Sequence, residues 1–248
     1  MEQKKNKKKG LVIGLVLCLA LVGVAGVMAW YASESSITNT FSTGNIKPPT
    51  TDPDQPTKPI DPNNPDKPVK PEHGVLDGNI YEKSWVPDSV IAPGSAVAKD
   101  PNIGLAPQSD DAYVFVYVKN NLGTGTYFEL KNNWKAVSDQ GVEKADKYNN
   151  EANKYTGGLF MYTKDGQNPE LLVADKKSKA EGGKDAWTGT VFDNVHAAPS
   201  ASITQQDPTM QVSCFMIAKS SSEENLTPGD AKTQAIAWAN HPNGPTVK

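Results

Sequence analysis

Residues 112–118 are apolar on both faces of an extended strand. Tyr113, Phe115 and Tyr117 alternate with valines, so the aromatic rings share one face and the valines the other. A strand of this kind lies inside a sheet that is covered by a layer on each side. Residues 210–218 repeat the pattern with different side chains, and we expect them to form a second such strand.

Shorter strand signals follow one another along the rest of the chain. Clusters of Gly, Asn, Asp and Pro between them suit turns. Residues 73–248 are enough for one domain with a substantial core. The sequence therefore predicts an all-β domain, an antiparallel β-sandwich of jelly-roll type with short helical insertions. The shorter strands are expected at residues 80–86, 125–130, 158–163, 170–173 and 187–192.

Two segments have helical character. Residues 142–155 are charged and contain alanine, which indicates an exposed helix or an ordered insertion. Near the end of the chain, Thr227 can cap a helix, Pro228 suits the first position, and Asp230 favours the positive end. The alternative for this second segment, which ends near residue 239, is a terminal strand. The side chains expected to face the sheet are Ala231, Ala235 and Trp238.

The start of the chain predicts export. Five lysines precede residues 11–30, a stretch of twenty residues without a charged side chain. This combination is typical of a signal peptide or membrane anchor, and the lysines keep the N-terminus in the cytoplasm. We expect an extracellular or cell-surface protein, with either cleavage near residue 29 or a retained anchor at 11–30. The expected cleavage region is Ala29, Trp30, Tyr31 and Ala32.

Two phrases resemble a known family. The first is A-W-Y-A-S at residues 29–33, followed by N-T-F-S-T-G-N at 39–45, and it resembles the export signal of TasA and camelysin-like secreted proteins. A weaker match comprises residues 91–95, 99–101 and 112–114, where a turn and a strand open the domain. The resemblance implies processing by a SipW-type signal peptidase, transient contact with the membrane, and a role as a structural subunit of the cell surface or matrix.

A free N-terminal strand suggests how such a subunit would assemble. After cleavage, residues 30–46 are expected to form a mature N-terminal strand that pairs with an open sheet edge of a neighbouring copy or of another matrix subunit. The alternative is that this phrase only guides the signal peptidase. The residues assigned to the assembly strand are Ile37, Asn39, Thr40, Phe41 and Gly44.

A proline-rich segment covers residues 47–72. Seven prolines, from Pro53 to Pro71, recur at every third residue, which matches the period of polyproline II. Fully extended, the segment would reach roughly 75 Å, so we expect a semi-rigid spacer between the N-terminal strand and the domain at 73–248. The alternative is a ligand for a proline-recognition domain.

Composition narrows the class of partner. The chain contains 25 lysines and no arginine. Cleavage after residue 29 removes five lysines and one glutamate, which leaves a formal charge of −7. An acidic chain without arginine is a poor match for nucleic acid. Cys18 leaves with the signal, so Cys214 has no partner for a disulfide, and its apolar surroundings indicate inert core.

Catalytic motifs are not found in the sequence. His73, His196 and His241 lie far apart and form no zinc-protease pattern. We therefore expect no enzyme activity, no cofactor and no metal site. The aromatic residues are expected to fill the core, with a carbohydrate-binding platform as the alternative. They are Trp85, Trp134, Trp187, Trp238, Tyr113, Tyr117, Tyr127, Phe128, Phe160 and Tyr162.

Three classes of function remain at this point. The first is the structural subunit, the second is a monomeric surface adhesin or binding module on a stalk, and the third is a hydrolase, for which the sequence offers no support. Size under native conditions distinguishes the first two classes, because a polymer favours assembly and a stable monomer favours display.

Overall fold

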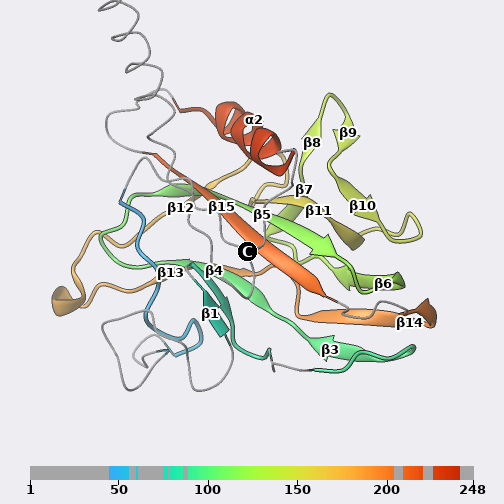
Figure 1. Cartoon of the computed structure of the whole chain (residues 1–248). Coiled ribbons are helices and arrows are strands. Elements are labelled where there is room, and N and C mark those ends of the chain that lie inside the picture. Colours follow the sequence, from blue (N-terminus) through green and yellow to red (C-terminus); the bar gives the residue numbers. More distant parts are fainter. Residues whose placement is uncertain are drawn as a thin grey trace, which may run out of the picture.

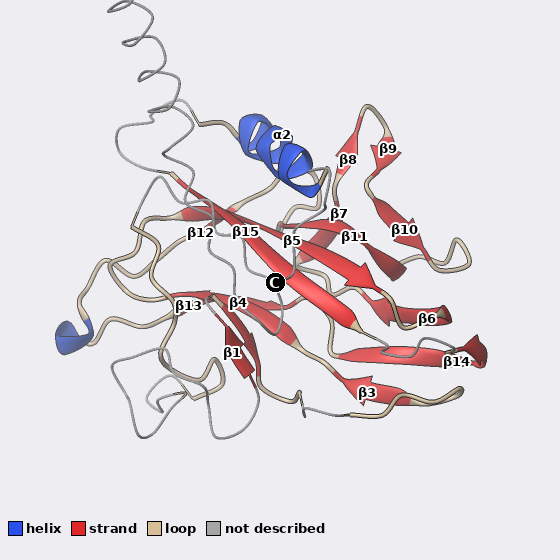
Figure 2. Cartoon of the chain, viewed as in Figure 1, coloured by secondary structure: helices blue, strands red, loops and turns tan. Residues whose placement is uncertain are grey.

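The computed structural model describes residues 45–55, 60, 75–77, 79–85, 89–203, 209–219 and 226–240. Strands dominate this part of the chain (Figure 2). The elements are β1 (Val75–Asp77), β2 (Ile80–Glu82), β3 (Ala96–Ala98), β4 (Pro101–Leu105), β5 (Ala112–Asn120), β6 (Thr124–Glu129), β7 (Trp134–Ala136), β8 (Ser138–Asp139), β9 (Val142–Glu143), β10 (Ala145–Lys147), β11 (Lys154–Tyr162), β12 (Leu171–Leu172), the 3₁₀ turn η1 (Lys179–Glu181), β13 (Ala186–Thr190), β14 (Asn194–Ser202), β15 (Met210–Ala218) and α2 (Pro228–Ala239).

The strands form two main sheets. The larger, nine-stranded sheet has the order β12, β5, β11, β6, β14, β3, with β15 beside β5 and with β7 and β10 beside β11. The smaller sheet has the order β1, β2, β4, β13, and β8 and β9 form a separate hairpin. The pairings between the described strands are antiparallel.

Strand β5 lies in the middle of a three-layered arrangement. Val114 and Val116 pack with Ile103 of the smaller sheet. On the opposite face, Tyr113 and Phe115 belong to the cluster that includes the buried residues of α2. Figure 1 shows α2 on one side of the large sheet and β1, β4 and β13 on the other. The predicted antiparallel sandwich, with a strand that is apolar on both faces, is confirmed.

Helix α2 begins and packs as the sequence predicts. The Thr227 hydroxyl accepts a hydrogen bond from the Asp230 N–H at 3.1 Å, and the Asp230 carboxylate accepts one from the Thr227 N–H at 3.1 Å. This reciprocal capping holds the pKa of Asp230 below its ordinary value. The Trp238 ring stacks on Phe215 at 5.1 Å between centroids. The buried side chains of the helix are Ala231, Ala235 and Trp238.

Residues 142–155 are not helical. They form β9, β10 and the start of β11. Gln140 and Gly141 have φ angles of 49° and 80°, which suits the two-residue turn between β8 and β9. Asn149 and Asn150, with φ of 50° and 55°, open the turn after β10. The helical alternative is therefore wrong, because these paired positive φ angles reverse the chain twice within a short distance.

The start of the expected spacer packs against the sandwich. The Ala106 N–H donates to the Lys47 carbonyl at 2.9 Å. Pro49 is buried against Gly104, where an added Cβ would lie 2.8 Å from the proline ring. The Asp185 carboxylate accepts hydrogen bonds from the Thr50 and Thr51 N–H groups at 2.8 and 2.7 Å. Residues 45–55 therefore belong to the packed body of the protein, which corrects the predicted boundary at residue 73.

The chain also turns back on itself after Thr50. The Ile60 N–H donates to the Thr50 carbonyl at 2.9 Å. A polyproline II helix would place residues ten positions apart at roughly 31 Å from each other. Thr50 and Ile60 are therefore much closer to each other than a fully extended path would place them. Residues 61–72 lie outside the described part of the chain.

Tyr81 on β2 is almost fully buried and packs beside Trp187, with 6.0 Å between the ring centroids. Burial, and to a lesser extent the charge of Asp52, raises the pKa of Tyr81 to about 12. In an unfolded chain a tyrosine ionises near pH ~10. The folded protein therefore holds this proton longer than the unfolded chain. The stability that this proton contributes is complete below pH ~10 and is lost as the pH rises through ~12.

We expect Tyr81→Phe to reduce the loss of stability at alkaline pH. Between about pH 9 and about pH 11.5, the wild-type protein should lose about 1–2 kcal/mol more unfolding free energy than the variant. Urea unfolding at a series of pH values measures this difference. Parallel curves for the two proteins would show that Tyr81 does not contribute.

Candidate functional site

The residues that the sequence assigns to processing and assembly lie outside the described part of the chain. This holds for the cleavage region, Ala29, Trp30, Tyr31 and Ala32, and for the assembly strand, Ile37, Asn39, Thr40, Phe41 and Gly44. The chain enters the described region at Asn45. Its N–H donates to the Asp110 carboxylate at 2.7 Å, and its side-chain amide donates to the Gln108 carbonyl at 2.9 Å.

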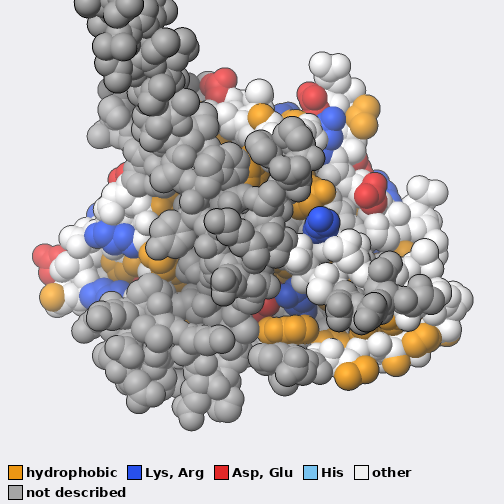
Figure 3. Space-filling model, in the orientation of Figure 1, with side chains coloured by type: hydrophobic (Ala, Val, Ile, Leu, Met, Phe, Trp, Pro, Cys, Tyr) orange, Lys and Arg blue, Asp and Glu red, His pale blue; other side chains and the backbone are white. Residues whose placement is uncertain are grey.

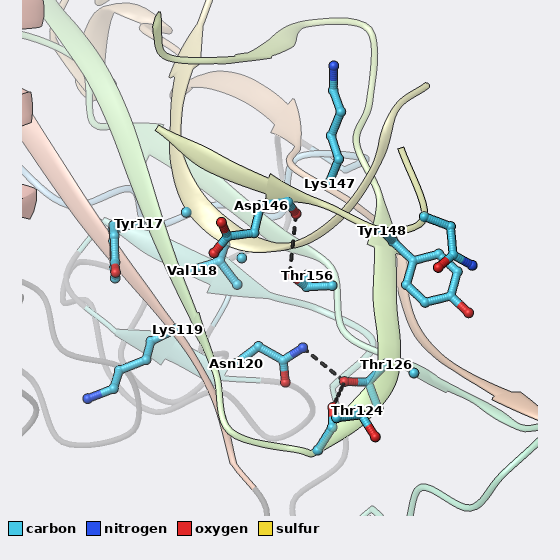
Figure 4. A pocket seen from close by; sticks show the side chains of 15 residues that line it. Tyr117, Val118, Lys119, Asn120, Thr124, Thr126, Asp146, Lys147, Tyr148 and Thr156 are labelled. Carbon is cyan, nitrogen blue, oxygen red and sulfur yellow. Dashed lines mark hydrogen bonds between the residues drawn. The ribbon is translucent and has the colours of Figure 1, made fainter. Parts of the chain in front are cut away.

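A groove of about 550 Å³ opens where β5 and β6 separate from each other (Figure 4). The β10–β11 hairpin forms its other wall. We call it the Tyr148 groove. The residues that line it are Tyr117, Val118, Lys119, Asn120, Gly123, Thr124, Gly125, Thr126, Asp146, Lys147, Tyr148, Asn149, Thr156, Gly157 and Gly158.

Strand register explains why this part of the sheet is hollow. Asp146 of β10 lies opposite Gly157 of β11. Gly158 lies opposite Val118 of β5. The two glycines therefore place no side chain between β10 and the end of β5. A Cβ at position 157 would lie 2.8 Å from the Val118 carbonyl oxygen, so a larger residue does not fit there.

Part of the polar lining is already engaged in holding the groove together. The Asn120 amide donates to the Thr126 hydroxyl at 2.9 Å, and that hydroxyl donates to the Gly123 carbonyl at 2.9 Å. On the opposite wall the Thr156 hydroxyl donates to the Asp146 carbonyl at 3.3 Å. Figure 4 shows these bonds around the opening. They fix the walls, whereas the exposed side chains nearby are directed at solvent.

A stack of three rings stands at one end of the groove. Tyr148 stacks on Tyr127 with 4.4 Å between centroids, and Tyr127 stacks on His196 at 5.1 Å. The Lys154 ammonium lies 5.1 Å from the centre of the Tyr127 ring. Tyr148 borders the groove and Tyr127 does not. Tyr127 covers one face of the Tyr148 ring, so the other face is the one available to a ligand.

The turn after β10 positions Tyr148. The Glu151 N–H donates to the Tyr148 carbonyl at 2.9 Å, and the Tyr148 N–H donates to the Lys154 carbonyl at 2.9 Å. Asn149 and Asn150 supply the positive φ angles of this turn. Asparagine tolerates that conformation better than most residues. The ring is therefore held by both backbone hydrogen bonds and stacking.

The aromatic residues fall into two groups. Those expected in the core are buried in large part, including Trp134, Trp238, Phe128, Phe160, Tyr113 and Tyr162. Tyr127 and His196 are only half-buried and belong to the surface stack with Tyr148. Tyr148 was not among the residues that the sequence singled out. The signal that points to it is the following Asn-Asn pair, which marks a turn and so a surface position.

Strand β3 forms one edge of the large sheet. The Lys99 N–H donates to the Asp193 carbonyl, and the Ala197 N–H donates to the Ser95 carbonyl. Because inward and outward groups alternate along an antiparallel strand, the N–H and C=O groups of Ala96 and Ala98 point away from β14. Among the described residues, β14 is the partner of this strand.

Residues 91–95, from the weaker of the two family-like phrases, contain a turn. The Ser95 N–H donates to the Ala92 carbonyl at 2.9 Å, and Gly94 has a φ of 81°, as the third residue of a type II turn requires. The chain then enters β3. Residues 112–114, the last part of the same match, open β5.

Lys99 joins the two sheets through a buried ion pair. Its ammonium lies 2.8 and 3.0 Å from the two carboxylate oxygens of Glu82 on β2. Only 6% of each side chain is exposed. The ammonium also lies 4.7 Å from the centre of the Trp85 ring. The next residue, Asp100, accepts the Ser84 N–H at 2.9 Å, and burial raises the pKa of its carboxyl.

The described residues offer few other groups that could bind a metal ion or react with a substrate. They contain no cluster of three His, Cys, Asp or Glu side chains that could hold a metal ion. Cys214 is buried on β15, and burial raises the pKa of its thiol well above the ordinary value. Within the same residues, no helix is long and apolar enough to cross a membrane.

Comparison with known proteins yields no match, whether to a family model, a curated protein or a solved structure. The function is therefore inferred from the residues and their geometry. Among the described residues, the β3 edge and the Tyr148 groove each offer an interaction surface.

Proposed function

We propose that this protein is an exported structural protein of the Gram-positive cell surface or extracellular matrix, and that copies assemble by strand addition. The lysine-rich start and the apolar stretch at 11–30 support export after processing by a SipW-type signal peptidase. The resemblance of residues 29–45 to the TasA and camelysin-like signal supports the structural role.

The observation that carries the proposal is the β3 edge. Ala96 is exposed, and the outward backbone groups of Ala96 and Ala98 can accept another strand. Residues 90–98 contain no charged side chain. Natural edges that avoid pairing are commonly protected by charges, and this edge lacks that protection. Figure 3 shows hydrophobic side chains gathered over β3 and β14, around this edge.

The position of Asn45 favours contact between copies. In Figure 1 the segment at residues 45–55 (blue) runs down the left side and β3 lies at the lower right. Asn45 is fixed beside the loop between β4 and β5 by its bonds to Asp110 and Gln108. A donor strand at 36–44 would leave one copy near Asn45 and pair with β3 of the next. Such a head-to-tail contact does not close on itself and generates a filament.

Sedimentation of the chain that begins at Ser33 tests the proposal. We expect large assemblies for the wild-type chain and monomers for Phe41→Asp, because Phe41 is the apolar anchor of the proposed donor strand. Ala98→Pro should also give monomers, since it removes an outward N–H and leaves the bonds to β14 in place. A matched Glu143→Pro variant in the β8–β9 hairpin, which also removes an outward N–H, should assemble normally. Monomeric wild-type chain, or assembly unaffected by both changes, would contradict strand addition.

A monomeric surface binding module is the second candidate. The Tyr148 groove favours it, since ligand sites are concave and carry a few fixed polar groups. A wild-type chain that stays monomeric and binds a ligand in this groove would make it the better assignment.

A further inference from the structure

We infer that the Tyr148 groove binds a neutral oligosaccharide. The volume of about 550 Å³ lies within the range of small-molecule sites. The inference goes beyond the proposed assembly function and uses other residues. It depends on three properties of the groove, namely its ring, its polar groups and its charge.

The Tyr148 ring offers a flat face at the end of the groove. A sugar ring presents a face of C–H groups, which packs favourably against the electron-rich face of an aromatic ring. Tyr127 and His196 support Tyr148 from behind, through centroid distances of 4.4 and 5.1 Å. The ring is therefore held in place before a ligand arrives, which reduces the entropy that binding would cost.

The polar groups of the groove include both donors and acceptors. Asp146, Lys119, Thr124 and Asn149 all line it and are exposed. A carboxylate accepts hydrogen bonds, an ammonium donates them, and the hydroxyl and amide groups do both. Sugar hydroxyls also donate and accept, so this mixture suits them. An apolar ligand would instead remove these groups from water without replacing their hydrogen bonds.

The charges of the groove favour a ligand without net charge. Asp146 and Lys119 both belong to the lining, and their charges offset each other. The second lysine, Lys147, is already paired with Glu143 at 3.1 Å. Figure 4 shows the Lys119 and Lys147 side chains extending away from the centre of the groove. An acidic ligand in the groove would therefore meet the Asp146 carboxylate without a lysine ammonium close beside it.

The stack also leads toward a second, smaller hollow. His196, at its far end, borders a space of about 130 Å³ with Glu129, Lys131 and Asp193 among its lining. The two hollows lie at opposite ends of the three stacked rings. This arrangement suits an extended chain of sugars better than a single sugar.

Titration of the exported protein with neutral tetrasaccharides tests the inference. Cellotetraose, chitotetraose, mannotetraose and maltotetraose serve as probes, with tetragalacturonate as the acidic comparison, followed by calorimetry and saturation-transfer NMR. We expect at least one neutral probe to bind and tetragalacturonate to bind more weakly. Tyr148→Ala should weaken binding by about tenfold, and Tyr148→Phe should retain it.

Two further variants keep the test independent of folding and of assembly. Asp146→Ala should weaken binding by about fivefold, whereas Asp139→Ala, a matched change in β8 outside the groove, should not. Ala98→Pro should bind as the wild type does, because β3 lies outside the groove. The inference is overturned by the absence of binding to every neutral probe, by tighter binding of tetragalacturonate, or by equal affinities in Asp146→Ala and Asp139→Ala.

Discussion

Replacing Lys99 by methionine is expected to lower the free energy of unfolding by about 3–5 kcal/mol. The methionine fills most of the space but leaves the Glu82 carboxylate buried without its partner. Two oxygen contacts, at 2.8 and 3.0 Å, are lost together with the contact to Trp85. The effect should be large because the pair is buried at the point where the chain passes from β3 of the large sheet to β4 of the small one.

Chemical denaturation of Lys99→Met and two comparison variants measures this effect. Lys131→Met removes an ion pair with Asp193 in which about half of each side chain is exposed, and should cost less than about 1 kcal/mol. The double variant Lys99→Met, Glu82→Leu should recover most of the stability, since no buried charge is then left unpaired. If Lys99→Met costs no more than Lys131→Met, the pair does not stabilise the sandwich.

Replacing Asp185 by alanine is expected to cost about 3 kcal/mol and to release the segment at residues 45–55. The Asp185 side chain is fully buried. One of its oxygens accepts three hydrogen bonds, from the Thr50 N–H at 2.8 Å, the Thr51 N–H at 2.7 Å and the Thr51 hydroxyl at 2.6 Å. Without the carboxylate, two backbone N–H groups of a partly buried segment lose their acceptor.

Hydrogen exchange at the Thr50 and Thr51 amides reports on this release directly. Both amides should exchange much faster in Asp185→Ala than in the wild type, because the segment opens locally. The control is Asp54→Ala in the same segment, where 71% of the side chain is exposed and the bond is to Lys83. If both amides remain protected from exchange in Asp185→Ala, other contacts hold the segment.

The parts of the fold that depend only on neighbouring residues could be predicted from the sequence. The strands at 112–118 and 210–218 follow from their two apolar faces, and both lie in the large sheet. The start of α2 follows from Thr227, Pro228 and Asp230, because capping involves only residues within one turn. Each of these features is determined by a few neighbouring residues.

The incorrect expectations have identifiable causes. Residues 142–155 contain residues that favour helix, but two turns set their path. Gln140-Gly141 and Asn149-Asn150 supply the positive φ angles, and both pairs are visible in the sequence. In the spacer, the period of the prolines is genuine. Pro49 is nevertheless buried, and the Asp185 carboxylate holds Thr50 against the sandwich.

The candidate sites depend on pairing between distant residues. The Tyr148 groove depends on Gly157 and Gly158 of β11, which lie opposite Asp146 of β10 and Val118 of β5 in two separate strand registers. The β3 edge likewise requires the sheet order. A single sequence does not specify either register, since each depends on which strands become neighbours.

Crosslinking between copies is the most direct test of strand addition. One chain that begins at Ser33 carries Thr40→Cys, and a second carries Ala96→Cys, while the native Cys214 stays buried. After mixing and mild oxidation, we expect a disulfide-linked dimer of the two different chains, and we expect it to be lost when Phe41→Asp is added to the first. The cysteine is also placed in turn at each residue from 39 to 43. If none of these chains forms a mixed dimer, the proposed assembly is contradicted.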